Sequence, residues 1–297
     1  MLSGLVKRLM GRLGGSTRSL GVARLLSSAQ SSDTNTMEHR YSDTRDYLLV
    51  RYPSTVFDDD SQAAGYGWIN KCYHNFYQTY HKEWDKSTAV LLEVGGGPCI
   101  YPFISAVPYV AEIYHSDYVK ACRDEVLMWK NKDPNAHDWS PYFKHVVQSL
   151  EGQTNPDAVI ERQENLRSLL KDVVPCDLKA DVVVPAVKGP VNIISSNYCL
   201  ESSFDSLEEY SVALKKLHDM LVPKGFFVSQ ALLGNTWYNL VDVKYYTSFS
   251  LSLQEAQTHY EQAGFEVVHA EMYNKPVSAR NINDDATGYG FFIARKL

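Results

Sequence analysis

The chain has 297 residues, of which 44% are hydrophobic and 22% charged, so it can form one large or two small globular domains. Its net charge of −6 at pH 7 offers no broad basic surface, which argues against binding to nucleic acid. No apolar run reaches the roughly 18 to 20 residues that span a bilayer, so the composition argues against a membrane span.

The N-terminal segment 1–36 differs from the rest of the chain in its charge. It holds several basic residues, leucines at helical spacing and no acidic residue before Asp33. This pattern predicts a mitochondrial transit peptide, and the alternative is a disordered, uncleaved leader. Initiation at Met37 would omit the segment and leave a cytoplasmic protein. We expect one domain over 37–297, with an N-terminal lid segment at 37–86 and a core at 87–297.

Apolar runs bounded by turn residues alternate with helical patterns through the rest of the chain. Before the first run, the aromatic segment from Tyr66 to Trp84 predicts a helical lid, with ordinary packing on a sheet as the alternative. Expected strands are 89–94, 111–116, 191–196, 225–231, 265–272 and 289–296. The alternation predicts an α/β fold whose largely parallel sheet carries helices on both faces.

Three helices are indicated between these strands. One is marked by the apolar stripe of Val159, Leu166, Leu170 and Val173. The other two begin at capping boxes, Ser206 with Glu209 and Ser252 with Glu255, and Gly264 is the expected C-terminal cap of the last.

The stretch AVLLEVGGGPCIY, residues 89–101, places Gly95, Gly96 and Gly97 at the end of the first expected strand. In an open parallel sheet, ligands bind beyond such strand ends. A dinucleotide fingerprint would need glycine where Ile100 stands, and no phosphate-loop G-K-[ST] follows. The glycine turn therefore favours close approach of an uncharged adenosine with an amino-acid tail over a pyrophosphate.

Two later carboxylates support this interpretation. Asp117 ends the second expected strand about 20 residues after the glycines, where it can accept hydrogen bonds from both ribose hydroxyls. Asp177 follows the inserted helix and the next strand end, within reach of an adenine amino group. The alternative for each is a helix cap or a solvated turn residue.

At this point the chain resembles a known family. The segments RDYLLVRY, LLEVGGGPCIY, HSDY, DWSPYFKHVVQSLEG, CDL, YCLESS, LVPKGFFV and FFIARKL resemble, in order, the nicotinamide, phenylethanolamine, indolethylamine and thioether methyltransferases. The resemblance runs from about Tyr41 to Leu297. It implies a seven-stranded class I methyltransferase fold, which is Rossmann-like, with S-adenosylmethionine as cofactor and S-adenosylhomocysteine as product.

The resemblance and the glycine turn together place the cofactor contacts. We expect them at Tyr47, Tyr52, Gly95, Gly97, Tyr101, Asp117, Tyr118, Cys122, Asp177, Leu178 and Asn197. Two of these depart from the family, since Cys122 stands where the nicotinamide branch has asparagine and Asn197 where it has threonine. Asn197 keeps its hydrogen-bonding capacity, whereas a thiol at 122 bonds weakly.

The acceptor side is expected to be aromatic and acidic, because an attacking amine is neutral and its product regains positive charge. The resemblance implies catalytic roles for Glu201 and Asp284, with Asp285 possible if the register shifts by one. Gln230 departs from the aspartate of the nicotinamide and indolethylamine branches. Substrate contacts are expected at Tyr198, Gln230, Tyr238 and Ser248, and the segment GNTWYNL, residues 234–240, is expected as a loop over the pocket.

The sequence thus predicts an S-adenosylmethionine-dependent N-methyltransferase of a small nicotinamide-, phenylethanolamine- or indolethylamine-like amine, acting as a monomer. A silent S-adenosylmethionine-binding sensor or scaffold is the alternative that Cys122 and Gln230 favour, and a dinucleotide oxidoreductase is a third. No metal is expected, since the five cysteines are widely spaced without a C-x-x-C pair and the nine histidines show no ligand spacing.

Overall fold

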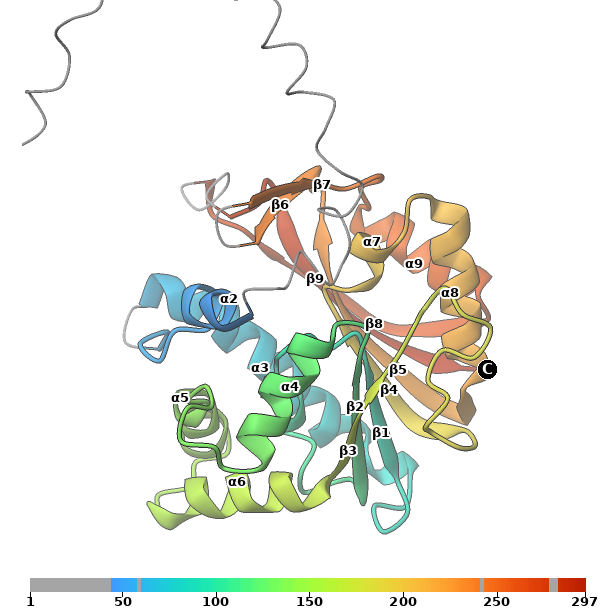
Figure 1. Ribbon diagram of the computed structural model, residues 1–297. Helices are drawn as coiled ribbons and strands as arrows, with labels where there is room; N and C mark the ends of the chain where they lie inside the picture. Colours follow the sequence, from blue (N-terminus) through green and yellow to red (C-terminus); the bar gives the residue numbers. More distant parts are fainter. Residues whose placement is uncertain (1–43, 58–59, 241–242, 278–282) are drawn as a thin grey trace, which may run out of the picture.

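The computed structural model describes residues 44–57, 60–240, 243–277 and 283–297 (Figure 1). The predicted leader 1–36 and the first residues of the segment 37–86 lie outside this part of the chain, so the targeting interpretation stays a prediction. Among the helices of the described residues, none is long and apolar enough to cross a membrane.

One seven-stranded sheet forms the centre of the molecule, in the order β3-β2-β1-β4-β5-β9-β8. Its strands β1 to β5 pair in parallel, and β9 runs antiparallel to both of its neighbours, β5 and β8. The strands are β1 (Val90–Val94), β2 (Glu112–Asp117), β3 (Leu170–Pro175), β4 (Val191–Asn197), β5 (Leu221–Leu233), β8 (Phe265–Asn274) and β9 (Gly288–Lys296). This topology confirms the predicted class I methyltransferase fold, and each of the six expected strands is present.

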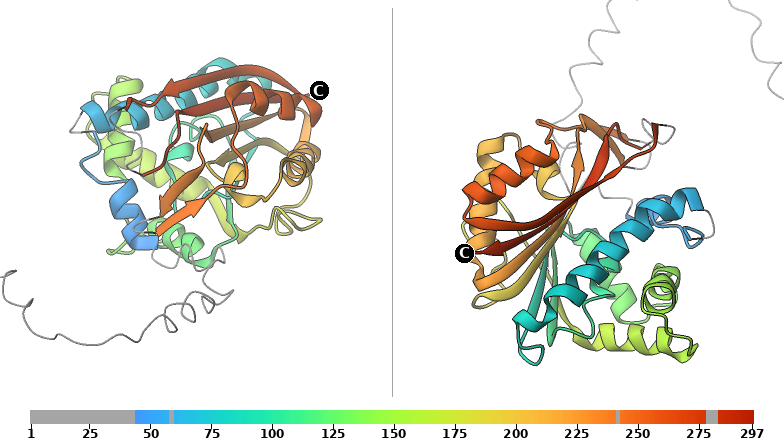
Figure 2. Two further views of the ribbon diagram at one scale, coloured as in Figure 1. Left: turned by 90° about the horizontal axis from the view of Figure 1, so that it is seen from above. Right: turned by 180° about the vertical axis from the view of Figure 1, so that it is seen from behind.

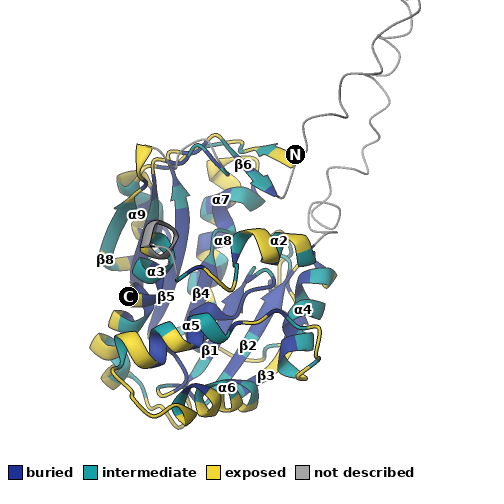
Figure 3. Cartoon of the chain, turned by 90° about the vertical axis from the view of Figure 1, so that its left-hand side faces the viewer, coloured by how far each residue is buried: buried dark blue, intermediate teal, exposed yellow. Residues whose placement is uncertain are grey.

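Helices cover both faces of the sheet (Figures 1 and 2). One face carries α3 (Asp60–Tyr80), α4 (Lys120–Lys130), α5 (Ser140–Lys144) and α6 (Asp157–Leu169), and the other carries α7 (Leu200–Ser203), α8 (Leu207–Asp219) and α9 (Leu253–Gln262). Successive strand residues alternate between the two, as Leu91 packs into the first layer and Leu92 into the second. Since both faces are covered, the central strands β1, β4 and β9 are largely buried, while the edge strands β3 and β8 carry exposed polar residues (Figure 3).

The remaining elements sit around the sheet. They are the short helix α2 (Thr44–Arg51), the 3₁₀ turns His81–Glu83 and Tyr101–Phe103, a π-helical segment His145–Leu150, and a separate hairpin of β6 (Trp237–Leu240) and β7 (Val243–Tyr246).

The predicted helix boundaries are largely confirmed. At the start of α9, Ser252 and Glu255 form both bonds of a capping box, and Gly264 follows the helix with a φ of +100°. At the start of α8, the Ser206 hydroxyl accepts from the Glu209 amide, but the Glu209 carboxylate accepts from the amide of residue 205 instead of closing the box.

The prediction that Val159, Leu166, Leu170 and Val173 lie on one helix was wrong for the last two residues. Helix α6 ends at Leu169, and Leu170 and Val173 belong to β3. Pairing with β2 decides this, because the segment from Leu170 onward hydrogen-bonds in parallel beside 113–117. Hydrogen bonding to β2 at the edge of the sheet therefore outweighs the helical spacing of the apolar residues. Val173 and Val174 also favour a strand, because β-branched side chains have a low helix propensity.

Two further segments differ in detail from the prediction. The segment 234–240 is not a loop throughout, because Trp237–Leu240 forms strand β6. The aromatic segment is helical in α3, and its Tyr73 and Phe76 rings pack edge-on against Phe291 and Phe226 of the sheet. Sheet packing, the alternative weighed above, therefore accounts for the C-terminal half of α3.

Candidate active site

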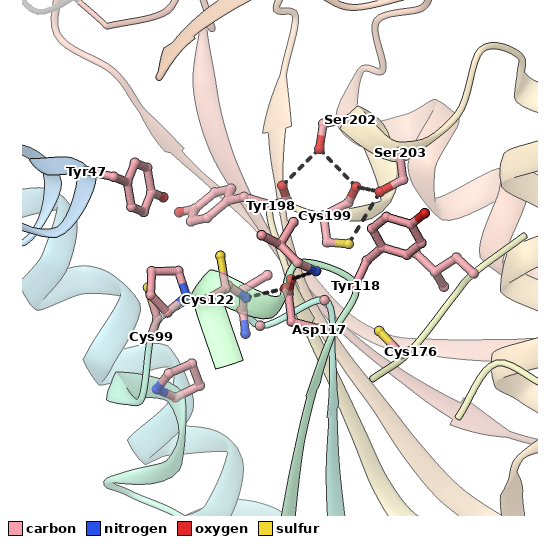
Figure 4. Close-up of a pocket in the computed structure, with 18 of the residues that line it drawn as sticks. Tyr47, Cys99, Asp117, Tyr118, Cys122, Cys176, Tyr198, Cys199, Ser202 and Ser203 are labelled. Atoms are coloured by element: carbon pink, nitrogen blue, oxygen red, sulfur yellow. Dashed lines mark hydrogen bonds between the residues drawn. The ribbon is translucent and has the colours of Figure 1, made fainter. Parts of the chain in front are cut away.

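A cavity of about 570 Å³ lies at the carboxyl ends of the parallel strands (Figure 4). It is lined by the turn after β1, the last residue of β2, the segment after β3 and the last residue of β4. Each of the eleven residues predicted to contact the cofactor lines it: Tyr47, Tyr52, Gly95, Gly97, Tyr101, Asp117, Tyr118, Cys122, Asp177, Leu178 and Asn197. Residues far apart in sequence thus converge on one cavity, because the carboxyl ends of parallel strands meet at one edge of the sheet.

The three glycines of the turn serve different purposes. A Cβ added to Gly95 would lie 2.1 Å from the Cys199 sulfur, and one added to Gly96 would lie 2.6 Å from Cγ of Glu93. These two glycines are required by the packing of the protein itself. Gly97 has a φ of +58°, and a Cβ there would meet no atom within 4 Å, so this position leaves space in the cavity for close approach of a ligand.

The Asp117 carboxylate connects the glycine turn to the start of α4. Its Oδ2 accepts from the Gly97 amide at 2.7 Å and its Oδ1 accepts from the Val119 amide at 2.8 Å. The residue is buried, at 7% exposure, and lines the cavity. A carboxylate held rigidly by two backbone amides beside an open glycine is well placed to accept hydrogen bonds from vicinal hydroxyls.

Asp177 is half-buried and lines the same cavity, next to Cys176, whose amide donates to the Asp117 carbonyl at 3.2 Å. Its Oδ1 accepts from the Lys179 amide at 2.8 Å, which holds the turn after β3. The turn-residue alternative therefore describes part of its role, while the side chain still lines the cavity beside Leu178.

Sulfur is abundant in the wall of this cavity. Four of the five cysteines line it, Cys99, Cys122, Cys176 and Cys199. Burial raises the pKa of the Cys176 thiol to about 12 and raises the pKa of Cys99 and Cys199 as well. The thiols of Cys99, Cys176 and Cys199 are therefore neutral, apolar wall residues at physiological pH. Among the described residues, no group of three or more metal-ligating side chains is found.

A second cavity of about 450 Å³ adjoins the first and shares Tyr47, Tyr52, Tyr198 and Ser202 with it. It is enclosed by α2, the start of α3, β6 and the ends of β8 and β9. Seven tyrosines line it: Tyr47, Tyr52, Tyr66, Tyr198, Tyr238, Tyr273 and Tyr289. Of the predicted acceptor residues, it brings together Tyr198, Tyr238 and Asp284.

Tyr198 stands at the boundary of the two cavities in a strained conformation. Its φ is +54°, in the left-handed region that aromatic residues rarely adopt, and its amide donates to the carbonyl of Gln230 at 3.0 Å. Figure 4 shows the hydroxyl groups of Tyr47 and Tyr198 pointing toward one another. The backbone at 198 thus holds an aromatic side chain where the two cavities meet.

Asp284 lies in the wall of the second cavity, but its charge is already paired. The Lys275 ammonium lies 2.6 Å from Asp284 Oδ1, and both side chains are only 5% exposed. Asp284 Oδ1 also accepts from the Ala286 amide at 3.0 Å. The neighbouring Asp285, the alternative register, instead binds the Thr236 amide at 2.7 Å and does not line the cavity.

The other three predicted acceptor residues line neither cavity. Glu201 is 4% exposed, accepts from the Leu232 amide at 2.8 Å, and has a pKa raised to about 7 by burial. Gln230 is buried behind Tyr101, whose hydroxyl lies 3.4 Å from its Oε1, and its Nε2 has no hydrogen-bond partner. The Ser248 hydroxyl donates to Asp205 at 3.2 Å on the exposed surface.

Sequence reasoning missed two charged residues of the second cavity, Arg51 and Lys275. Arg51 had a usable signal, because it follows Tyr47 by four residues and therefore shares its face of α2. Lys275 had none, since it meets Asp284 only through the antiparallel pairing of β8 and β9.

A model of the NNMT/PNMT/TEMT family matches residues 30–297. The chain belongs to this family. It is 31% identical over 209 residues to nicotinamide N-methyltransferase of Sus scrofa, covering 70% of this chain and 77% of that protein. It is 30% identical over 253 residues to indolethylamine N-methyltransferase of Oryctolagus cuniculus, covering 85% and 92%. Phenylethanolamine N-methyltransferase of Rattus norvegicus is 28% identical over 260 residues, with 85% and 87% covered.

Solved methyltransferase structures match the chain at TM-scores below 0.5. One is a 1,6-didemethyltoxoflavin-N1-methyltransferase of Burkholderia thailandensis, at a TM-score of 0.45 and 15% identity, with 88% of this chain and 91% of that chain covered.

As a member of the NNMT/PNMT/TEMT family, the chain is an S-adenosylmethionine-dependent N-methyltransferase. Its first cavity fits that cofactor, because Gly97 leaves room against the backbone and Asp117 presents a fixed carboxylate beside it. The silent binding homologue considered above finds no support, since the relatives are named as enzymes.

Proposed function

We propose that the protein methylates the nitrogen of a small aromatic amine or aromatic N-heterocycle that binds in the second cavity, while S-adenosylmethionine binds in the first. The observation that carries the proposal is the shared wall of Tyr47, Tyr52, Tyr198 and Ser202. Two ligands in adjoining cavities can meet only across this wall, which favours a direct transfer between them.

When bound, S-adenosylmethionine would supply the methyl group: the acceptor nitrogen's lone pair forms the new N–C bond while the C–S bond breaks and its electron pair stays on sulfur. An amine acceptor then releases an N–H proton to solvent, whereas a ring nitrogen that carries no hydrogen keeps the positive charge. The residues of the chain need only align the acceptor and exclude water. Tyr66, Tyr198 and Tyr289 provide aromatic walls for a flat ring. The Tyr198 and Tyr289 rings meet edge-on at 6.0 Å between centroids.

We assign Glu201 a positioning role. Its carboxyl holds the Leu232 amide at 2.8 Å, and Leu232 lines the second cavity. Glu201 therefore acts on the acceptor through the end of β5. Asp284, with Lys275, forms part of the cavity wall itself.

The proposal is tested on the full chain by titration calorimetry with S-adenosylmethionine, followed by measurement of S-adenosylhomocysteine release with nicotinamide, aniline, phenylethanolamine and indolethylamine. Cofactor binding followed by release with at least one aromatic acceptor is expected. Tyr289→Ala, at a residue that lines the second cavity but not the first, should lower kcat/KM for that acceptor by about tenfold or more while leaving cofactor affinity within about threefold. Cofactor binding without release on any of the acceptors would overturn the proposal.

A further inference from the structure

The second cavity has an unusual balance of charge for a site that receives an amine. Apart from its tyrosines, its ionisable lining residues among the described part of the chain are Arg51, Lys275 and Asp284. Burial raises the pKa of Tyr66 and Tyr198, so these two tyrosines remain neutral. Two cations therefore face one carboxylate, and the wall carries net positive charge.

The single carboxylate has little capacity left for a cationic ligand. Asp284 is bound to Lys275 at 2.6 Å, and both side chains are 95% buried. Displacing a partner from a buried ion pair leaves an uncompensated charge, which is strongly unfavourable. A protonated amine in this cavity would thus meet an already neutralised acid and an additional cation.

Arg51, in contrast, keeps charge and donors for a ligand. Its Nη2 donates to the carbonyl of Asn239, and to that of Asn283 at 3.4 Å, which fixes the guanidinium between α2 and the strand β6. Both bonds use the same nitrogen and neutral acceptors. Arg51 forms no ion pair with a described residue, so its charge has no carboxylate partner there.

A guanidinium with free donors at the edge of an aromatic cavity matches a planar carboxylate, because its N–H groups fit the two oxygens in a fork. We propose that the acceptor carries a carboxylate, held by Arg51, on the same small aromatic molecule whose nitrogen is methylated. This inference rests on the proposed function, since it assigns the substrate class of the second cavity. The cavity then balances its own charge when the acceptor is bound.

The first experiment compares acceptors in matched pairs that differ in the carboxylate. The pairs are nicotinamide with nicotinate, aniline with 3-aminobenzoate, and phenylethylamine with 4-(2-aminoethyl)benzoate, each assayed on the full chain at saturating S-adenosylmethionine. The carboxylate member should show a kcat/KM at least about tenfold higher, the effect of one charge-assisted hydrogen-bonded contact. Equal or lower values for the carboxylate members would overturn the inference.

The second experiment removes the guanidinium. Arg51→Gln should lower kcat/KM for the carboxylate member by about tenfold or more and change the uncharged member less than about threefold. Arg51→Lys should recover part of the loss, since it restores charge without the fork. The matched control is Arg45→Gln, on the same helix, because Arg45 pairs with Glu125 and lines neither cavity. Equal losses on both members of a pair would contradict a carboxylate contact.

A binding measurement separates this inference from the proposed reaction. Benzoate is titrated calorimetrically into the full chain saturated with S-adenosylhomocysteine. Binding that weakens about tenfold or more in Arg51→Gln but not in Arg45→Gln supports the carboxylate site even if no acceptor is methylated, in which case only the proposed reaction fails. Absence of benzoate binding, or equal binding to both variants, overturns the carboxylate site whatever the turnover.

Discussion

The two cavities are built in different ways. The first is made mainly of the turns and last residues at the carboxyl ends of parallel strands, such as the turn 95–97 and the segment 176–179. The second is made of side chains that arrive from α2, α3, β6 and the connection between β8 and β9. The sheet topology therefore fixes the cofactor half, whereas the acceptor half depends on contacts between distant segments. Such a division lets one fold keep its cofactor while the acceptor changes.

The largest effect is expected in the acceptor half, from breaking the buried ion pair. Lys275→Met leaves Asp284 buried without its cation and should lower the free energy of unfolding by about 3 to 5 kcal/mol, measured by urea denaturation at pH 7. The control Lys215→Met breaks an exposed pair with Asp219 and should lose less than about 1 kcal/mol. Similar small losses in both variants would show that Lys275 does not neutralise Asp284.

The next effect concerns the cofactor half. Asp117→Ala removes the carboxylate that the Gly97 amide binds at 2.7 Å and that we expect to accept the ribose hydroxyls. The Kd for S-adenosylmethionine should rise by about a hundredfold, the loss of two charge-assisted hydrogen bonds, measured by calorimetry. Asp124→Ala, at an acid paired with Lys120 on the surface of α4, serves as the control. An unchanged Kd for S-adenosylmethionine in Asp117→Ala would show that Asp117 does not bind the cofactor.

Alanine substitutions at Gly95 and Gly97 distinguish a glycine required for packing from one required for ligand binding. Gly95→Ala drives a Cβ to 2.1 Å from the Cys199 sulfur and should lower the free energy of unfolding by roughly 2 kcal/mol or more. Gly97→Ala meets open space, so it should destabilise by only about 1 kcal/mol, from its positive φ, and should weaken cofactor binding about tenfold. If Gly97→Ala leaves the cofactor Kd unchanged, the cofactor does not approach the turn at that position.

The smallest effect is in the pH dependence of stability. Burial raises the pKa of Glu201 to about 7, so the native state keeps a proton that the unfolded chain has released. The stability from this protonated group is fully present below the usual glutamate pKa and is lost as the pH rises through about 7. Glu201→Gln should therefore lose less unfolding free energy between pH 6 and pH 7 than the wild type, by about 1 kcal/mol.

The same pH comparison needs a control and a second probe. Glu93 also has a pKa raised to about 7 by burial, so some dependence should remain in Glu201→Gln. Glu208→Gln, at an exposed residue of α8, should follow the wild type across this range. A positioning role for Glu201 also predicts a higher KM for the acceptor in Glu201→Gln with little change in cofactor Kd. If the stability of Glu201→Gln depends on pH in the same way as that of the wild type does, the pKa of Glu201 does not differ between the native and unfolded states.

The sequence by itself determined the sheet and the cofactor side. Apolar runs leading into Gly95 and Asp117 predicted which residues meet at the carboxyl edge, because parallel strands bring their ends together whatever lies between them. Local caps such as Ser252 with Glu255 were equally readable, since their partners lie within one helical turn. The helix-to-strand change at Leu170 was not, because pairing with β2 decided it.

The acceptor side was decided by the tertiary structure. Asp284 and Glu201 both fit the predicted role of an amine-contacting acid, yet only assembly of the chain pairs the first with Lys275 and places the second behind Leu232. Arg51 becomes a cavity residue only when the end of α2 lies against β6. The charge of a site depends on which side chains meet in space, and long-range contacts of this kind leave no periodic signal in the sequence.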